Sequence, residues 1–84
     1  MAVSGDNIQE RVCRLIGDQF NVPPESISRE TTALDIDGWD SVTHVYLMLE
    51  IERRFGVKIP DDRVFNLDNV GDLIDVLAEL MGGR

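Results

Sequence analysis

The residues best placed for chemistry in this sequence are an adjacent aspartate and serine, Asp40 and Ser41. They stand at the start of a run, Val42 to Phe55, whose apolar residues recur at helical spacing. A serine in the first turn of a helix presents its hydroxyl beside unpaired backbone N–H groups, at the positive end of the helix dipole. Such a position favours a phosphate ester. We therefore interpret Ser41 as a covalent attachment point; in the ordinary alternative, Asp40 is a helix N-cap and Ser41 a small tolerated residue.

The serine also has a histidine nearby, which raises the possibility of hydrolase chemistry. His44 follows Ser41 by three residues, so their side chains could meet on one face of a helix. The chain has no other histidine and no glycine-flanked nucleophile, and a domain this small offers no enclosed pocket. The sequence therefore predicts no catalytic residue and an exposed His44, with contact between His44 and a phosphate on Ser41 as the alternative.

Two further features suggest a metal site, but neither has the ligands that such a site requires. If Gly38 took the invariant sixth position of a calcium loop, positions one and twelve would be Ala33 and His44, which carry no carboxylate. Cys13 is the single cysteine, so it has no partner for a disulfide or a metal site. We expect no metal site and a partly buried, unreactive Cys13 thiol.

The composition limits the class of protein and its partners. Sixteen Asp and Glu against eight Lys and Arg give a net charge of −8, which opposes binding to nucleic acid and to anionic lipid. With 84 residues, 43% of them hydrophobic, the chain is expected to form one domain, 1–84, and a monomer. The lone cysteine and the lack of a signal-like or membrane-length apolar run predict a cytoplasmic location.

Apolar periodicity predicts an all-α domain whose ends, 1–5 and 82–84, are flexible. The four expected helices span 6–20, 41–55, 61–66 and 69–81. The first and last carry core stripes made of Ile8, Val12, Leu15, Ile16 and Phe20, and of Val70, Leu73, Ile74, Leu77, Leu80 and Met81. A long connection over 21–40 has possible anchors at Val22, Ile27, Leu34, Ile36 and Trp39. We expect this loop to be pinned to the helices.

The second helix carries more apolar residues than one core-facing stripe needs. Leu47, Met48, Ile51 and Phe55 have the spacing of a core stripe. A second set consists of Val42, Val45, Tyr46 and Leu49. One helix of so small a domain can hardly bury both sets, so we expect the second to be partly exposed and to contact a partner or whatever Ser41 carries. Cover by the loop and the third helix is the alternative.

The segment Asp37 to Val42 closely resembles the phosphopantetheine attachment region of acyl carrier proteins. The resemblance continues through Val45, Leu47 to Glu52, Phe55-Gly56 and Ile59-Pro60, and covers nearly the whole chain. It implies an antiparallel four-helix bundle, with three main helices, one short helix and a long loop between the first and second. It also implies that a phosphopantetheinyl transferase attaches 4′-phosphopantetheine to Ser41, within the motif Asp40-Ser41. The arm would hold acyl groups as thioesters, and the chain itself would perform no catalysis.

The same resemblance implies a docking face on the second helix. Val42, Val45 and Leu49 match positions that meet partner enzymes or cover the arm. With their neighbours they make the predicted docking face, which comprises Val42, Val45, Tyr46, Leu49, Glu50 and Arg53.

Departures from the commonest family pattern point away from bulk fatty-acid synthesis. Trp39 stands just before the Asp-Ser pair, where a small residue is frequent, and Asp37 precedes Gly38 where many fatty-acid carriers have leucine. In the second helix the acidic residues are offset by Arg53 and Arg54. We therefore expect a polyketide or other specialised pathway, with acyltransferase, ketosynthase or adenylating enzymes as partners. The alternatives are a peptidyl or aminoacyl carrier and an unmodified helical interaction module.

Overall fold

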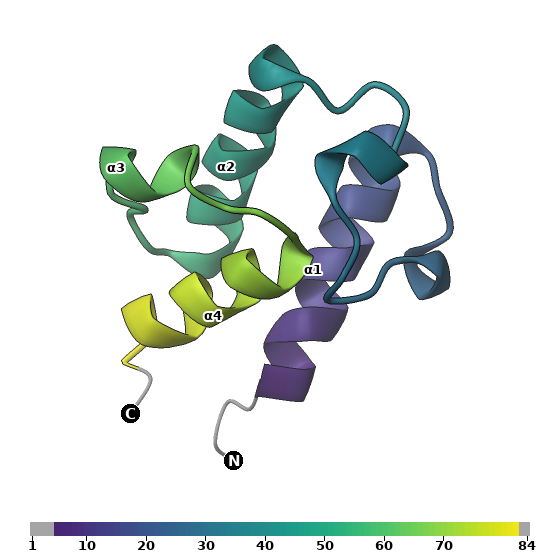
Figure 1. Cartoon of the computed structure of the whole chain (residues 1–84). Coiled ribbons are helices and arrows are strands. Elements are labelled where there is room, and N and C mark those ends of the chain that lie inside the picture. The colour runs from purple at the N-terminus through teal and green to yellow at the C-terminus, as the bar shows by residue number, and fades with distance from the viewer. Residues whose placement is uncertain (1–4, 83–84) are drawn as a thin grey trace.

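The computed structural model describes residues 5–82, which form helices and turns and no strand (Figure 1). The helices are α1 (Gly5–Phe20), α2 (Ser41–Phe55), α3 (Asp61–Val64) and α4 (Val70–Leu80). Two short 3₁₀ turns, η1 (Pro24–Ser26) and η2 (Ala33–Asp35), lie in the long connection between α1 and α2. The predicted all-α fold, with three longer helices, one short helix and a long loop, is confirmed.

Two helices are shorter than expected, for local reasons. α3 ends at Val64 and not at residue 66, because the chain closes a turn in which the Asn66 N–H donates to the Arg63 carbonyl at 3.3 Å. α4 begins at Val70 because Asn69 is its N-cap and accepts a hydrogen bond from the Asp72 N–H at 2.9 Å. The predicted flexible ends, 1–5 and 82–84, fall mostly outside the described residues, although Gly5 opens α1 and Gly82 lies in a turn.

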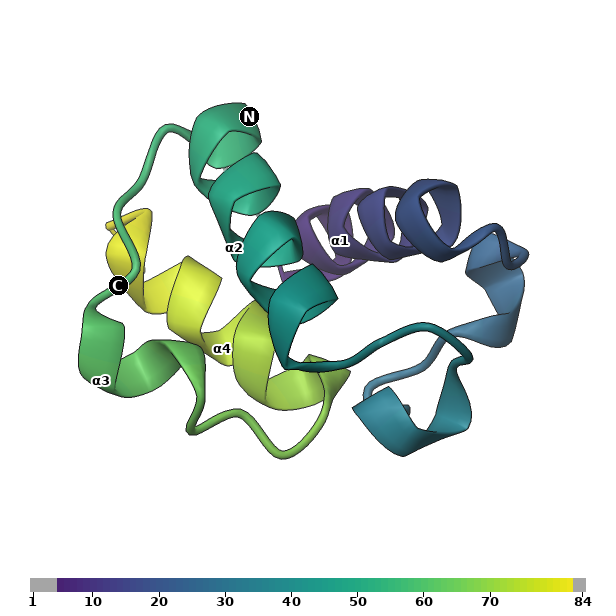
Figure 2. The ribbon, with the colours of Figure 1, turned by 90° about the horizontal axis from the view of Figure 1, so that it is seen from above.

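The core lies between α1, α2 and α4. α1 packs against both other helices. α1 and α2 run in opposite directions in the view of Figure 1, and Figure 2 shows that they cross at an angle. The expected core stripes are buried, except that Phe20, Leu80 and Met81 are only partly buried at its edge. The buried core comprises Ile8, Val12, Cys13, Leu15, Ile16, Ile27, Ile36, Leu47, Met48, Ile51, Phe55, Ile59, Val70, Leu73, Ile74, Val76 and Leu77.

The long loop is pinned to the start of α4, as expected. The first N–H groups of α4 donate to loop carbonyls, Val70 to Thr31 at 2.9 Å and Gly71 to Arg29 at 2.8 Å. These bonds satisfy donors that a helix start otherwise leaves unpaired. Leu34 is not an anchor, in contrast to the prediction, because it lies on the outer side of η2 and is 97% exposed.

Candidate functional site

The start of α2 is fixed by a reciprocal cap between Asp40 and Thr43. Asp40 Oδ1 accepts hydrogen bonds from the N–H groups of Val42 and Thr43, each at 3.0 Å. In return, the Asp40 N–H donates to Thr43 Oγ1 at 2.8 Å, and that hydroxyl donates to the Gly38 carbonyl at 2.7 Å. Gly38 has φ 89°, a left-handed conformation that glycine adopts readily. The cap therefore holds Ser41 as the first residue of α2 with its side chain exposed.

This cap changes the expected surroundings of the Ser41 hydroxyl. The sequence suggested unpaired N–H groups beside it, yet two of them are taken by the Asp40 carboxylate. The Thr43 N–H, with that of Val42, lowers the pKa of Asp40, since hydrogen bonds to a carboxylate favour its charged form. Asp40 is thus the N-cap, as in the ordinary alternative, while Ser41 remains an exposed hydroxyl at a rigid corner.

We expect Asp40→Ala to lower the thermal unfolding midpoint at neutral pH, because the cap is lost. Asp40→Asn retains an acceptor oxygen and should lose less. A carboxylate with a lowered folded-state pKa stabilises the fold above its unfolded pKa, about 3.9, and this contribution disappears as the pH falls through the folded-state pKa. The difference between wild type and Asp40→Ala should therefore narrow in acid, as measured by circular dichroism from about pH 7 to about pH 2. A difference that stays constant across this range would contradict the assignment.

An open cleft of about 260 Å³ lies directly beside Ser41. Besides Asp40 and Ser41, its lining is made by Ala33, Trp39, His44, Phe65 and Leu67. The lining combines the loop before α2, the first turns of α2 and the segment after α3. A hydroxyl at the rim of a cleft with apolar walls can carry a group that is then partly sheltered by these side chains.

Four rings pack in series around this corner. Phe20 stacks on Trp39 with centroids 5.3 Å apart, Trp39 stacks on His44 at 6.1 Å, and His44 lies 5.4 Å from Phe65. These residues come from the end of α1, the loop, α2 and the segment after α3. The ring series therefore ties all these segments together at the start of α2.

His44 is half-buried, and the expectation of an exposed side chain was wrong. Trp39 Nε1 donates to His44 Nδ1 at 3.0 Å, and His44 Nε2 lies 2.6 Å from the Val64 carbonyl oxygen. The indole N–H can only donate and the carbonyl can only accept, so Nδ1 carries no proton and Nε2 carries one. Both ring nitrogens are occupied, which removes His44 as a base for Ser41 and as a ligand for a phosphate there.

Comparison with known families matches residues 10–77 to the family described as the phosphopantetheine attachment site. The chain belongs to this family. Among its relatives is an acyl carrier protein of Acidothermus cellulolyticus, 35% identical over 78 residues that cover 93% of each chain. An acyl carrier protein of Rickettsia bellii is 34% identical over 88% of this chain and 86% of its own.

Solved structures support the same conclusion. The solution structure of a holo acyl carrier protein from Geobacter metallireducens has a TM-score of 0.80 and 29% identity, covering 89% of this chain and 86% of its own. The acyl carrier protein of Enterococcus faecalis has a TM-score of 0.76, 20% identity and coverage of 93% of this chain and 99% of its own, and shows likeness of fold alone.

The chain is therefore a non-catalytic acyl carrier that holds 4′-phosphopantetheine covalently. When attached, that group supplies a terminal thiol on a long arm, which holds acyl groups as thioesters. The structure offers what the attachment needs, namely an exposed primary hydroxyl at a fixed helix start, beside a cleft with apolar walls.

The second apolar stripe of the carrier's α2 is exposed, as expected. Val42, Val45, Tyr46 and Leu49 are 61%, 39%, 62% and 52% exposed. The acidic residues of α2 are engaged. Glu50 is paired with Arg53 at 3.2 Å and Arg54 at 2.9 Å, and Glu52 accepts the Ile59 N–H at 2.6 Å. The exposed face of α2 is thus apolar, with arginines at its far end.

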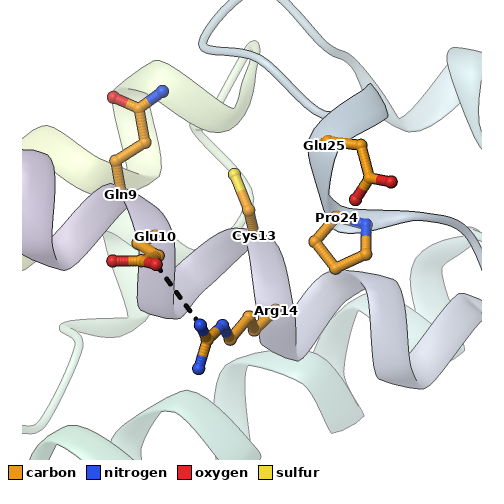
Figure 3. A pocket seen from close by; sticks show the side chains of 6 residues that line it. All are labelled: Gln9, Glu10, Cys13, Arg14, Pro24 and Glu25. Atoms are coloured by element: carbon orange, nitrogen blue, oxygen red, sulfur yellow. Dashed lines mark hydrogen bonds and ion pairs between the residues drawn. The ribbon is translucent and has the colours of Figure 1, made fainter.

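Two hollows of the carrier that are larger than the cleft beside Ser41 lie away from this residue. One of about 510 Å³ lies between α1 and η1 and is lined by Gln9, Glu10, Cys13, Arg14, Pro24 and Glu25 (Figure 3). Glu10 and Arg14 lie one turn apart on α1 and form an ion pair at 3.3 Å. Cys13 Sγ lies 3.6 Å from the Ile27 carbonyl, and burial raises the pKa of this thiol. The thiol therefore stays protonated at neutral pH, as expected of an unreactive cysteine.

Among residues 5–82 no cluster of three or more potential metal ligands occurs. No helix in the same range has both the length and the apolar character to span a membrane. The Asp35 carboxylate, which lies in the segment considered above for a calcium loop, accepts the Thr32 N–H at 2.9 Å at the start of η2.

Sequence reasoning missed the hydrogen bonds of His44 and the role of Phe65. Trp39 and His44 are five residues apart, across the start of a helix, a spacing for which no pairing rule exists. The Val64 carbonyl that completes the series lies twenty residues further along the chain. The single signal was Trp39 itself, a large ring at a place where the family often has a small residue.

Proposed function

We propose that Ser41 is the residue of this carrier that holds 4′-phosphopantetheine. The observation that carries the proposal is the exposed Ser41 side chain at the first position of α2, with its backbone fixed by the Asp40–Thr43 cap. A transferase needs an accessible hydroxyl that does not have to be ordered before reaction. The cleft next to Ser41 adds apolar surface along which the arm can lie.

The test uses the purified chain with coenzyme A, magnesium and a broad-specificity phosphopantetheinyl transferase. We expect the intact mass to rise by one phosphopantetheine, and fragmentation to place the added mass on the peptide that contains Ser41. A folded sample that keeps its apo mass, or one modified at another residue, would contradict the proposal.

We further propose that the carrier serves a polyketide or other specialised pathway. The support is the chemistry of α2: Glu50 is covered by two guanidinium groups, and Glu52 is turned to the Ile59 N–H. An enzyme that recognises carriers through a row of free carboxylates would find few of them here. Trp39, stacked on Phe20 and hydrogen-bonded to His44, is a second departure from the commonest pattern, and it shapes the wall of the cleft.

Loading assays identify the pathway class. Transfer of an acyl group to the holo carrier by an acyltransferase, and its use by a ketosynthase, would agree with the polyketide role. Loading by an adenylating enzyme with an amino acid would instead make the chain an aminoacyl carrier.

We propose that the carrier works as a monomer in the cytoplasm, where the free Cys13 thiol is compatible with reducing conditions.

We also propose that partners dock on the face formed by Val42, Val45, Tyr46, Leu49, Glu50 and Arg53. Leu49 lies two turns from Ser41 and is 52% exposed, so a change there does not crowd the reacting hydroxyl. We expect Leu49→Asp to lower kcat/KM for modification by the transferase about tenfold, equivalent to about 1.4 kcal/mol, because it places a charge in an apolar contact.

The matched control is Leu34→Asp, which places the same charge on an exposed leucine outside α2. Its kcat/KM should equal that of the wild type. Equal losses in the two variants would indicate a general effect of charge, and no loss in Leu49→Asp would remove Leu49 from the docking face.

A further inference from the structure

Two hollows meet at the side chains of Trp39 and His44. The outer one is the open cleft of about 260 Å³ that includes Ser41. The inner one is about 30 Å³ and reaches the buried residues Val70 and Leu73 of α4. Both have Ala33, Trp39, His44 and Leu67 in their walls, and Trp39 and His44 provide the two rings of this shared wall between the attachment corner and the interior.

The two hollows differ in size and therefore in what they can hold. A space of about 30 Å³ is comparable to the volume of one water molecule in the liquid, whereas pockets that bind small ligands usually measure about 300–1,000 Å³. The inner hollow is therefore too small for an acyl chain. The outer cleft approaches the size of a ligand pocket but is open to solvent.

The wall between the hollows is held from both sides. Trp39 Nε1 donates to His44 Nδ1 at 3.0 Å, and His44 Nε2 donates to the Val64 carbonyl at 2.6 Å. Phe20 stacks on Trp39 at one end of the series, and Phe65 lies against His44 at the other. Turning the imidazole out of the way would break both hydrogen bonds of His44 and its ring contacts with Trp39 and Phe65, so the wall favours one closed arrangement.

We propose that Trp39 and His44 form a closed wall that keeps cargo attached at Ser41 out of the inner hollow. A long acyl chain on this carrier lies outside this wall, where partner enzymes can reach it, and does not enter the space beside Val70 and Leu73. In this role His44 is a positioning residue that excludes the chain through its two hydrogen bonds. The inference rests on the proposed attachment to Ser41.

The test compares short and long cargo in three ¹⁵N-labelled proteins: wild type, His44→Ala and Leu34→Ala. Leu34 is an exposed apolar residue that lines neither hollow and lies outside the proposed docking face, so Leu34→Ala is the matched control. Acetyl and octanoyl forms are prepared by a broad-specificity transferase from acetyl and octanoyl coenzyme A. Intact mass verifies each loading first, so that a failure of attachment at Ser41 is recognised separately from a failure of the wall.

The readout is the position of the Val70 and Leu73 amide signals in the acetyl and octanoyl forms. In wild type and Leu34→Ala we expect these signals to coincide in the two forms. In His44→Ala the two hollows merge, and we expect octanoyl, but not acetyl, to shift both signals. The proposal would be overturned if octanoyl shifted the two signals equally in wild type and His44→Ala. It would also be overturned if octanoyl shifted neither signal in a folded His44→Ala protein.

If His44→Ala does not fold, the same measurement is made on Trp39→Phe. It retains an aromatic ring against Phe20 and removes only the N–H that fixes His44 Nδ1. We expect octanoyl to shift the Val70 and Leu73 signals in this variant by more than in wild type, and unchanged signals would overturn the proposal.

Discussion

Replacing Ser41 with alanine is expected to abolish the gain of one phosphopantetheine completely. The proposed modification joins the Ser41 Oγ to a phosphate, and alanine offers no oxygen for this bond. The exposed side chain makes no contribution to the core, so the variant should fold like the wild type. Intact mass after incubation with coenzyme A and the transferase measures the loss, and circular dichroism measures the fold.

Two serines of the loop that precedes α2, Ser26 and Ser28, are compared with Ser41. Ser26 Oγ donates to the Pro23 carbonyl at 2.7 Å, and Ser28 Oγ lies 3.5 Å from Thr31 Oγ1, so both hydroxyls are engaged in local turns. Ser28→Ala should therefore be modified at the wild-type rate. Residual modification of Ser41→Ala would place the attachment elsewhere and overturn the assignment.

Replacing a fully buried core residue is expected to have the largest effect on stability. Leu77 in α4 and Ile51 in α2 are both 0% exposed and belong to the same core. Truncation to alanine removes buried methyl and methylene groups and leaves a cavity, which costs about 2–5 kcal/mol. A small domain has about 5–15 kcal/mol of total stability, so either variant removes a large part of it.

Urea unfolding measures these changes, with Leu34→Ala as the control. Leu34 has the same side chain as Leu77 but is 97% exposed, so its truncation should change the free energy of unfolding by less than about 0.5 kcal/mol. Unchanged stability in both Leu77→Ala and Ile51→Ala would show that the core lies elsewhere.

The bounds of α2 and the buried stripes could be predicted because their causes are local. Asp40 caps the helix through the next residues of the chain, and Gly56 ends it with φ 68°, a left-handed conformation. Apolar residues at helical spacing identify the core face whatever the tertiary structure. Leu34 was misplaced because spacing along a loop carries no such information: the turn η2 directs Leu34 outward and leaves Ile36 to enter the core.

The exposed position of Ser41 at the start of α2 could be predicted, but its surroundings could not. The family resemblance pointed to the Asp-Ser pair, but the cleft and its wall depend on contacts between distant segments. The sequence predicts an exposed His44, because an exposed position is the ordinary one for a helix residue so close to Ser41. Only the folded chain brings the Val64 carbonyl and the Trp39 indole to its two nitrogens.

The Asp40 cap has a consequence for how the tether at Ser41 would move. Because the carboxylate already occupies the Val42 and Thr43 N–H groups, a phosphodiester on the neighbouring residue would find these donors engaged and a like charge beside it. Repulsion between the two anions would push the phosphodiester end of the tether away from the start of α2. The tether would then move through a larger volume. High salt would screen this repulsion and let the tether settle closer to the protein.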